Sequence, residues 1–329
     1  MIAPLNWTEL VDEALKRRRK EGLTQKEHAA IAGVSIPTIL AFDRKRTRLS
    51  LNKAMDILRV VGLVAEPSRA SSQSSFVEAA ENRWENLISE LPDNSPARQP
   101  LGNYAVSYEL TEFSLRSVRE LQECLKKAAS HKYTGWPPFW VPTRTAIAPY
   151  PFEGGVECWL GRPDAERAFD DAAHSDFWRA SLDGRLYLRR GYQEDTADML
   201  QPATIFDLTL PVWRAGEALL HAYHLAEAVA VSQKSECHFS VFYRGLTGRE
   251  LKSWANPYRE VFEIHRGRVG EVKNTVRCRS LQIKEQLVEL VYDLLVPIYE
   301  SFDFFELKRE LVEDELSKLQ KDRNSRQRP

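Results

Sequence analysis

Basic and hydroxyl-bearing side chains are concentrated in one short stretch near the N-terminus. Four cations, Arg44, Lys45, Arg46 and Arg48, closely follow residues 35–43, a segment that opens with Ser, Ile, Pro and Thr. Guanidinium and ammonium groups bind phosphate oxygens, and hydroxyl and methyl groups can contact the edges of bases. The stretch therefore has the residue types that bind a nucleic acid, provided that they lie on one surface.

Two short helices joined by a tight turn are predicted to position these side chains, over residues 25–32 and 36–43. Ala29 is small enough to let the two helices approach closely. Gly33 takes the turn, where a positive φ costs glycine least. Ser35 is placed to cap the second helix by accepting a backbone N–H. This combination predicts a helix-turn-helix.

The segment resembles the Cro/lambda-repressor-like (XRE) helix-turn-helix family over about residues 7–64. The resemblance implies an all-α, five-helix DNA-binding domain, with a first helix over about 10–21 and two helices formed from 49–63. It also implies double-stranded DNA as the partner, bound by a homodimer. Carried over by position, the DNA-binding residues are Gln25, Ser35, Ile36, Pro37, Thr38, Ala41, Arg44, Lys45, Arg46 and Arg48.

Three features depart from the family pattern. His28 stands where the family places an aliphatic core residue, which predicts a half-buried histidine. Lys45 replaces the usual loop glycine. Ile36 and Pro37 offer no hydrogen bond to a base edge, so discrimination between sequences would rest on thymine-methyl contacts, Thr38 and DNA shape.

Charge is distributed unevenly along a chain that is nearly neutral as a whole. Residues 1–65 carry 12 Lys and Arg against 7 Asp and Glu, a net charge of +5, and the remainder carries 34 against 40, a net of −6. A polyanion is therefore attracted to one end of the molecule. The basic run 16–20 ends the first predicted helix; we interpret it as a phosphate contact, the alternative being a solvated helix end.

The rest of the composition is typical of a cytoplasmic protein. The four cysteines form no CxxC pair, which argues against a disulfide framework or a zinc site, and we expect no metal or other cofactor. The N-terminus lacks the pattern of a signal peptide, and no apolar run is long enough to span a bilayer, so no membrane partner is expected.

Four regions are predicted, giving an α+β fold class. The helix-turn-helix domain covers 1–65, and 66–103 is a linker, flexible over 66–75, with a short helix over 76–91. A larger α+β sensor or assembly domain covers 104–306, and a C-terminal helix with a basic tail covers 307–329. From residue 104 onward, alternating and apolar patterns predict strands at 106–110, 156–160, 185–189, 205–210, 237–243, 260–265 and 275–283. They predict helices at 114–129, 211–231, 285–300 and 304–321.

The larger region also resembles the C-terminal region of bacterial proteins that begin with an AlbA/Schlafen-type DNA-binding domain. The segments that carry this resemblance are 134–143, 174–195, 205–222 and 248–257. It implies a module paired with different nucleic-acid-associated N-terminal domains, and it identifies neither a ligand nor a reaction.

Two clusters in the larger region could in principle do chemistry. Glu217, His221 and His224 have a spacing that places three metal ligands on one helical face, but no fourth ligand accompanies them and the helix is apolar all round. His174 with Asp176, beside Arg179 and Trp178, could form a general base, but no nucleophile motif accompanies them. We therefore predict packing roles for both, with no metal site, no catalytic residue and no enzymatic activity.

Six of the eight tryptophans lie between Trp136 and Trp254. They could line a pocket for a planar or anionic ligand, or they could form an ordinary core. The arginines and tyrosine expected beside such a pocket are Arg189, Arg190, Tyr192, Arg244 and Arg249.

The overall expectation is a sequence-specific transcriptional regulator with a ligand-sensing or oligomerisation domain. The C-terminal helices carry Leu311, Leu316 and Leu319 at near-heptad spacing, which predicts either a dimer seam or a capping helix pair. Two other functions remain open: a defence-type effector enzyme, and an antitoxin-like interaction protein, each using the helix-turn-helix for targeting or autoregulation.

Overall fold

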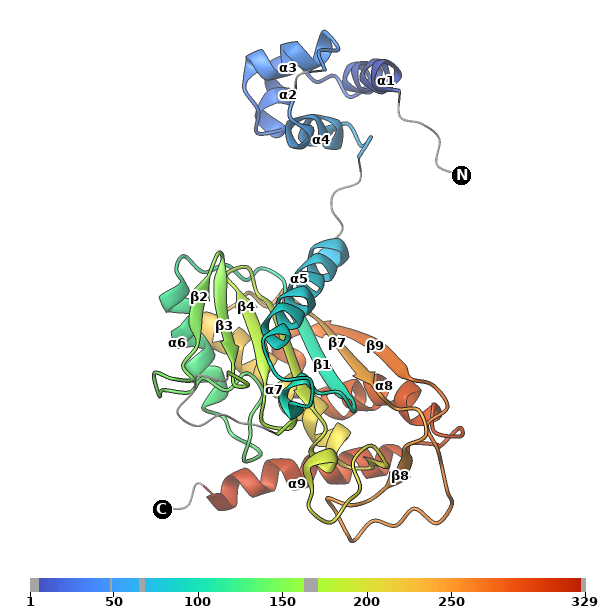
Figure 1. Ribbon diagram of the computed structural model, residues 1–329. Helices are drawn as coiled ribbons and strands as arrows, with labels where there is room; N and C mark the ends of the chain where they lie inside the picture. Colours follow the sequence, from blue (N-terminus) through green and yellow to red (C-terminus); the bar gives the residue numbers. More distant parts are fainter. Residues whose placement is uncertain (1–5, 48, 65–68, 163–170, 327–329) are drawn as a thin grey trace. The chain divides into compact units, whose positions relative to one another are not determined.

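The chain folds into two compact units, 1–72 and 73–329. The computed structural model describes residues 6–47, 49–64, 69–162 and 171–326 (Figure 1). The fold is mixed α+β, with 41% helix and 19% strand. No helix in these ranges is both long enough and apolar enough to cross a membrane.

The first unit is built from four short helices within residues 6–64. They are α1 (Trp7–Lys20), α2 (Gln25–Ile31), α3 (Ile36–Asp43) and α4 (Leu51–Val60). Val11, Ala29, Ile39, Phe42 and Ile57 form the centre of its core.

The expectation of two helices from residues 49–63 is wrong, because this segment forms α4 alone. Ala54, Ile57, Leu58 and Val61 are all buried, and their spacing of three and four residues places them on one face of a continuous helix. Gly62, with φ of +65°, then ends it. A five-helix domain is therefore not observed in the described part of the first unit.

A seven-stranded sheet forms the centre of the second unit. Its order is β2-β3-β4-β5-β1-β7-β9, and every neighbouring pair is antiparallel. The strands are β1 (Asn103–Leu110), β2 (Tyr150–Phe152), β3 (Gly155–Trp159), β4 (Phe177–Ser181), β5 (Arg185–Gly191), β7 (Glu236–Arg244) and β9 (Glu271–Arg279). A separate parallel pair joins β6 (Ile205–Asp207) to β8 (Glu250–Lys252).

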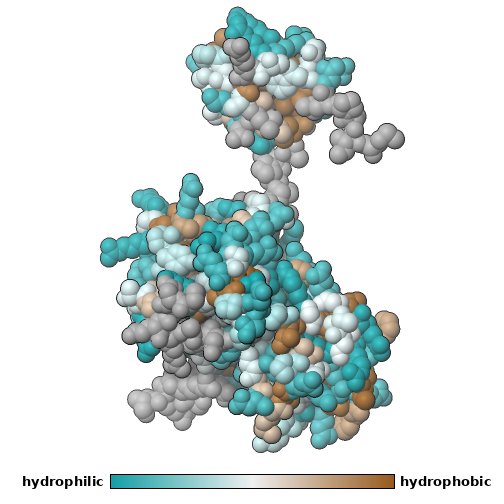
Figure 2. Space-filling model, viewed as in Figure 1, coloured by the Kyte–Doolittle hydropathy of each residue, from teal (hydrophilic) through white to brown (hydrophobic). Residues whose placement is uncertain are grey.

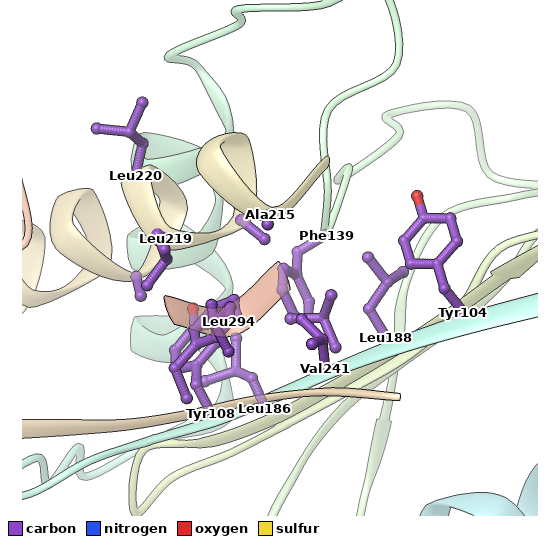
Figure 3. Packing of buried hydrophobic residues seen from close by; sticks show 14 of the residues in the cluster. Tyr104, Tyr108, Phe139, Leu186, Leu188, Ala215, Leu219, Leu220, Val241 and Leu294 are labelled. Carbon is purple, nitrogen blue, oxygen red and sulfur yellow. The ribbon is translucent and has the colours of Figure 1, made fainter. Parts of the chain in front are cut away.

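Helices cover both faces of this sheet. On one face lie α6 (Val118–Ala129), α7 (Leu210–Val229) and α8 (Leu287–Glu300), and the main core is formed there (Figures 1 and 3). Tyr104 and Tyr108 of β1 point into this core, whereas the intervening Ala105 packs on the opposite face with α5 (Arg69–Ser89). Since both faces are covered, all eight residues of β1 are buried.

Helix α5 packs against the sheet and does not act as a linker. Phe76, Ala80 and Trp84 are buried against Phe177 and Tyr187 of the sheet. Residues 69–75 are also helical, in contrast to the predicted flexible segment, while 65–68 lie outside the described residues. A packed helix nucleates its own extension, so a polar stretch with weak helix propensity can continue it.

Helix α9 (Arg309–Arg326) is packed into the second unit. Leu316 and Leu319 are buried, and Leu311 is half-buried against the main core. A Cβ at Gly216 of α7 would lie 2.4 Å from Leu316 Cδ2, so a larger residue here would require the Leu316 side chain to move. These leucines are used within one chain, which rules out the predicted dimer seam and leaves the capping interpretation.

The local predictions differ from the structure at several further places. Strand β9 covers 271–279 and not 275–283, α9 begins at 309 and not 304, and β2 and β8 were not predicted. Helix α6 begins after Ser117, whose hydroxyl accepts the Glu120 N–H at 3.2 Å, and not at residue 114. Residues 260–265 form no strand. Strand β4 was not predicted, because it is buried on both faces and shows no alternation. The visible surface is largely hydrophilic, with scattered apolar patches (Figure 2).

Candidate nucleic-acid interface

Local hydrogen bonds and one glycine fix the angle between α2 and α3. Thr24 and Glu27 form a capping box: the Glu27 N–H donates to Thr24 Oγ1 at 3.2 Å, and the Thr24 N–H donates to Glu27 Oε2 at 2.9 Å. Gly33 has φ of +62°, as the predicted turn requires. Ala29 is fully buried in the core of the unit. The α2–turn–α3 arrangement therefore matches the predicted spacing.

Helix α3 has a buried side and an open side. Ile39 and Phe42 are buried, whereas Pro37 is exposed and Ile36 is 42% exposed. Thr38 and Ala41 lie on the outer surface and line one shallow hollow. The residues predicted to read bases are thus brought to one accessible surface.

The predicted capping role of Ser35 is wrong. Its hydroxyl makes no hydrogen bond to the α3 backbone, and instead lies 2.9 Å from Thr38 Oγ1. The first turn contains Pro37, which has no N–H to donate, so a side-chain cap has one fewer donor to satisfy. Ser35 therefore orients the Thr38 hydroxyl.

Several basic residues of this unit are neutralised internally. Arg18 makes two hydrogen bonds to Asp43, at 3.0 and 2.7 Å, and is 8% exposed. Lys45 pairs with Asp12 at 2.7 Å, and Arg17 with Glu13 at 3.0 Å. The basic run 16–20 is consequently not a uniform phosphate-binding surface, and the predicted phosphate contact of Lys45 would have to break an ion pair.

Lys45 has a clear structural role in the loop after α3. Its φ is +59°, the left-handed conformation that glycine adopts most easily. Its carbonyl accepts the indole N–H of Trp7 at 3.2 Å, and its ammonium bonds Asp12. These contacts hold the loop after α3 in place.

Three cations beside α3 are left without a carboxylate. Arg44, Arg46 and Lys53 make no ion pair with any residue in the described ranges, and Arg46 and Lys53 line the same hollow as Thr38. Lys53 on α4 was not predicted from the sequence, because its proximity depends on the packing of α4 against α3. Arg48 lies outside the described residues.

Gln25 lies at the start of α2, as predicted. Its side-chain amide donates to Asp43 Oδ2 at 2.6 Å. Because an amide NH2 carries two donors, one N–H remains for a phosphate oxygen. Asp43 thus orients Gln25 and Arg18 together.

His28 is fully buried and not half-buried. Its Nε2 lies 2.9 Å from the Ile57 carbonyl and must carry the proton, while Nδ1 has no hydrogen-bond partner. Burial lowers the pKa of His28 below its ordinary value. When the pH falls, protonation of His28 would place a charge in this buried site, which costs free energy.

The first unit is therefore expected to lose stability as the pH falls below about 6.5, the pKa of an unfolded histidine. Folded His28 binds a proton less readily than the unfolded residue does. The stability that neutral His28 contributes is therefore fully present above about pH 6.5 and is lost as the pH falls below it. His28→Leu should remove this loss. Hydrogen exchange of peptides from α1–α4, compared between wild type and variant at pH 7.5 and at about pH 5, tests it. An equal loss of protection against exchange in wild type and variant, on going from pH 7.5 to about pH 5, would contradict the prediction.

The side chains of Glu217, His221 and His224 in the second unit each hydrogen-bond a different residue. Glu217 accepts hydrogen bonds from the Thr134 N–H and hydroxyl, His221 lies 2.8 Å from the Tyr108 hydroxyl, and His224 lies 2.9 Å from the Tyr133 hydroxyl. No group of three metal-ligating side chains was found in the described part of the chain.

The residues of the possible general base are each paired with another residue. His174 pairs with Asp171 at 2.8 Å, whereas Asp176 is fully buried and bonded to Arg190. Arg179 pairs with Glu157 on another part of the sheet.

The arginines expected beside an aromatic pocket are engaged by carboxylates. Each is bonded to a carboxylate: Arg189 and Arg244 to Glu81, Arg190 to Asp176, and Arg249 to Asp195. A buried cation without a partner is costly, so buried arginines are usually paired with carboxylates.

The open side of α3 and the cations beside it give the first unit a surface that suits an anionic polymer. Comparison with protein-family models, curated proteins and solved structures found no match to this chain.

Proposed function

We propose that this chain is a sequence-specific DNA-binding transcriptional regulator of the lambda-repressor-like type. One observation carries the proposal. The outer face of α3 is open, and Arg44, Arg46 and Lys53 beside it lack carboxylate partners within the described ranges. Arg19, Lys20 and Lys26 also lack one in these ranges, whereas the other described cations of the unit are paired. Unpaired cations concentrate positive potential at the surface that α3 presents.

In this proposal, the start of α3 enters the major groove. The Thr38 hydroxyl, oriented by Ser35, would bond a base edge or a phosphate, and Ile36 and Pro37 would contact thymine methyl groups. Arg44, Arg46 and Lys53 would bind the phosphates on either side. Their contribution is independent of sequence and weakens with salt.

The second unit would act as a sensor or assembly module and not as an enzyme. A single helix-turn-helix makes few base contacts, so we propose that the chain binds as a homodimer. The dimer surface would lie outside Leu316 and Leu319, since both are buried within the chain. Sedimentation of the full chain with and without operator DNA tests the dimer.

DNA binding should show a specific site and a salt slope set by the unpaired cations. We expect Arg44→Gln/Arg46→Gln to make the slope of log K against log salt shallower by about two, because each phosphate that a cation neutralises contributes about 0.9 to it. Thr38→Ala should weaken the specific site about tenfold and leave non-specific binding unchanged. Binding to genomic fragments, including the gene's upstream region, over a salt series measures both.

Lys126→Gln/Lys308→Gln is the charge-matched control, because both lysines are exposed side chains of the second unit. It should leave slope and specificity unchanged. Sequence-blind binding by the wild type, or equal slopes in the arginine and lysine variants, would refute the proposed function.

A further inference from the structure

A cavity of about 640 Å³ opens in the second unit, next to the start of α7. Three tryptophans from separate parts of the chain line it. Trp136 comes from the loop after α6, Trp213 from the first turn of α7 and Trp254 from the loop after β8. Cavities of this size commonly hold small organic ligands.

The cavity also contains an arginine that has no carboxylate. Arg214 Nη2 donates to Gln193 Oε1 at 2.6 Å, while its Nη1 is buried and has no hydrogen-bond partner among the described residues. No ion pair of Arg214 occurs within the described ranges, although Arg190 and Arg249 in the same unit are both paired. Arg214 is half-buried and lines the cavity, so an anion bound there would give its guanidinium the carboxylate that no described residue supplies.

The nearest acidic residue on the same helix is committed elsewhere. Glu217, one turn after Arg214, accepts the N–H groups of Tyr133 and Thr134, at 3.2 and 2.9 Å, together with the Thr134 hydroxyl. It holds the loop that carries Trp136 and does not form an ion pair with Arg214. The charge of Arg214 opposes the rise in the pKa of Glu217 that burial causes, so the two side chains interact electrostatically without forming an ion pair.

The tryptophans offer mainly carbon surface to a ligand. The Trp136 indole N–H donates to Asp176 Oδ2 at 3.2 Å, and the Trp213 indole N–H donates to Glu315 Oε2 at 3.0 Å. With these donors satisfied inside the protein, the rings favour a planar apolar group. Arg214 is the one arginine or lysine lining the described cavity, which suits a single negative charge better than a phosphate dianion.

We infer that this cavity binds a small aromatic carboxylate, with the carboxylate on Arg214 and the ring among Trp136, Trp213 and Trp254. The inference names a ligand class for the sensing role of the second unit, and to that extent it rests on the proposed function. Binding itself does not depend on DNA, so the two can fail separately.

Calorimetric titration of the full-length chain, without DNA, tests the inference. The probes are benzoate, phenylacetate and indole-3-acetate, each paired with its neutral amide. At least one acid should bind about tenfold or more tightly than its amide, because the amide cannot form the charged hydrogen bond. Arg214→Gln should remove this preference, and Arg214→Lys should retain part of it.

Arg116→Gln is the control variant, because this arginine is exposed and lies outside the cavity. Thermal unfolding confirms that each variant is folded. Equal affinity for acid and amide, a preference that survives in Arg214→Gln, or no binding of any acid at millimolar concentrations would overturn the inference. An acid preference in a chain that shows no specific DNA binding would overturn the proposed function alone.

Discussion

Asp176→Ala is expected to destabilise the second unit by about 3–5 kcal/mol, the usual cost of leaving one member of a buried ion pair alone. Asp176 is fully buried, and its oxygens accept Arg190 Nε at 2.7 Å and Arg190 Nη2 at 2.5 Å. The guanidinium is only 2% exposed, so water cannot replace the carboxylate. Urea unfolding of the full chain, followed by tryptophan fluorescence, measures the change in stability.

A second variant separates the ion pair from the packing around it. Asp176→Leu/Arg190→Met removes both charges and keeps apolar volume, which is often close to neutral for stability. It should recover most of the stability that Asp176→Ala removes. If the free energy of unfolding of Asp176→Ala lies within about 1 kcal/mol of that of wild type, Arg190 is not held in a buried ion pair as described.

Glu194→Gln is expected to stabilise the second unit by about 3 kcal/mol at pH 8 or above, and to have little effect near pH 4. Glu194 is buried, and desolvation together with the charge of Asp207 raises its pKa to about 7, against the lowering effect of hydrogen bonds such as the one from the Asp207 N–H. The folded state therefore holds the proton more tightly than the unfolded state does. This stabilisation is complete below about pH 4.5 and is lost as the pH rises through 7.

Glutamine keeps an oxygen for the Asp207 N–H and carries no charge to bury. The difference in unfolding free energy between variant and wild type should therefore increase from about pH 4.5 to 7 and then level off. Chemical unfolding at several pH values tests this, with Glu310→Gln as the control, because Glu310 is exposed on α9. A difference that does not change with pH would contradict the prediction.

Short-range signals in the sequence determined the local structure of the first unit. Thr24 and Glu27 begin α2, Gly33 makes the turn, and α3 has the predicted limits of 36 and 43. These signals act through the backbone of neighbouring residues, so no distant contact is needed to read them. The same reasoning located α7 and α8 to within two residues at each end.

Contacts between distant segments decided what local patterns left open. The packing of α5 and α9 onto the sheet and onto α7 depends on faces that those partners supply, so a linker and a dimer seam were equally consistent with the residues alone. Strand β4 was missed for a similar reason, since burial on both faces removes the alternation that identifies a strand.

The candidate sites divide in the same way. The sequence by itself placed Thr38, Arg44 and Arg46 near one helix, because residues close in the chain stay close in space. Which cations are paired was decided by the tertiary structure, because an ion pair such as Arg18 with Asp43 joins two helices. Folding likewise brings Arg214 beside three tryptophans while it pairs the arginines that the sequence had suggested. A charge acquires its role only when its neighbours are known, and those neighbours come from elsewhere in the chain.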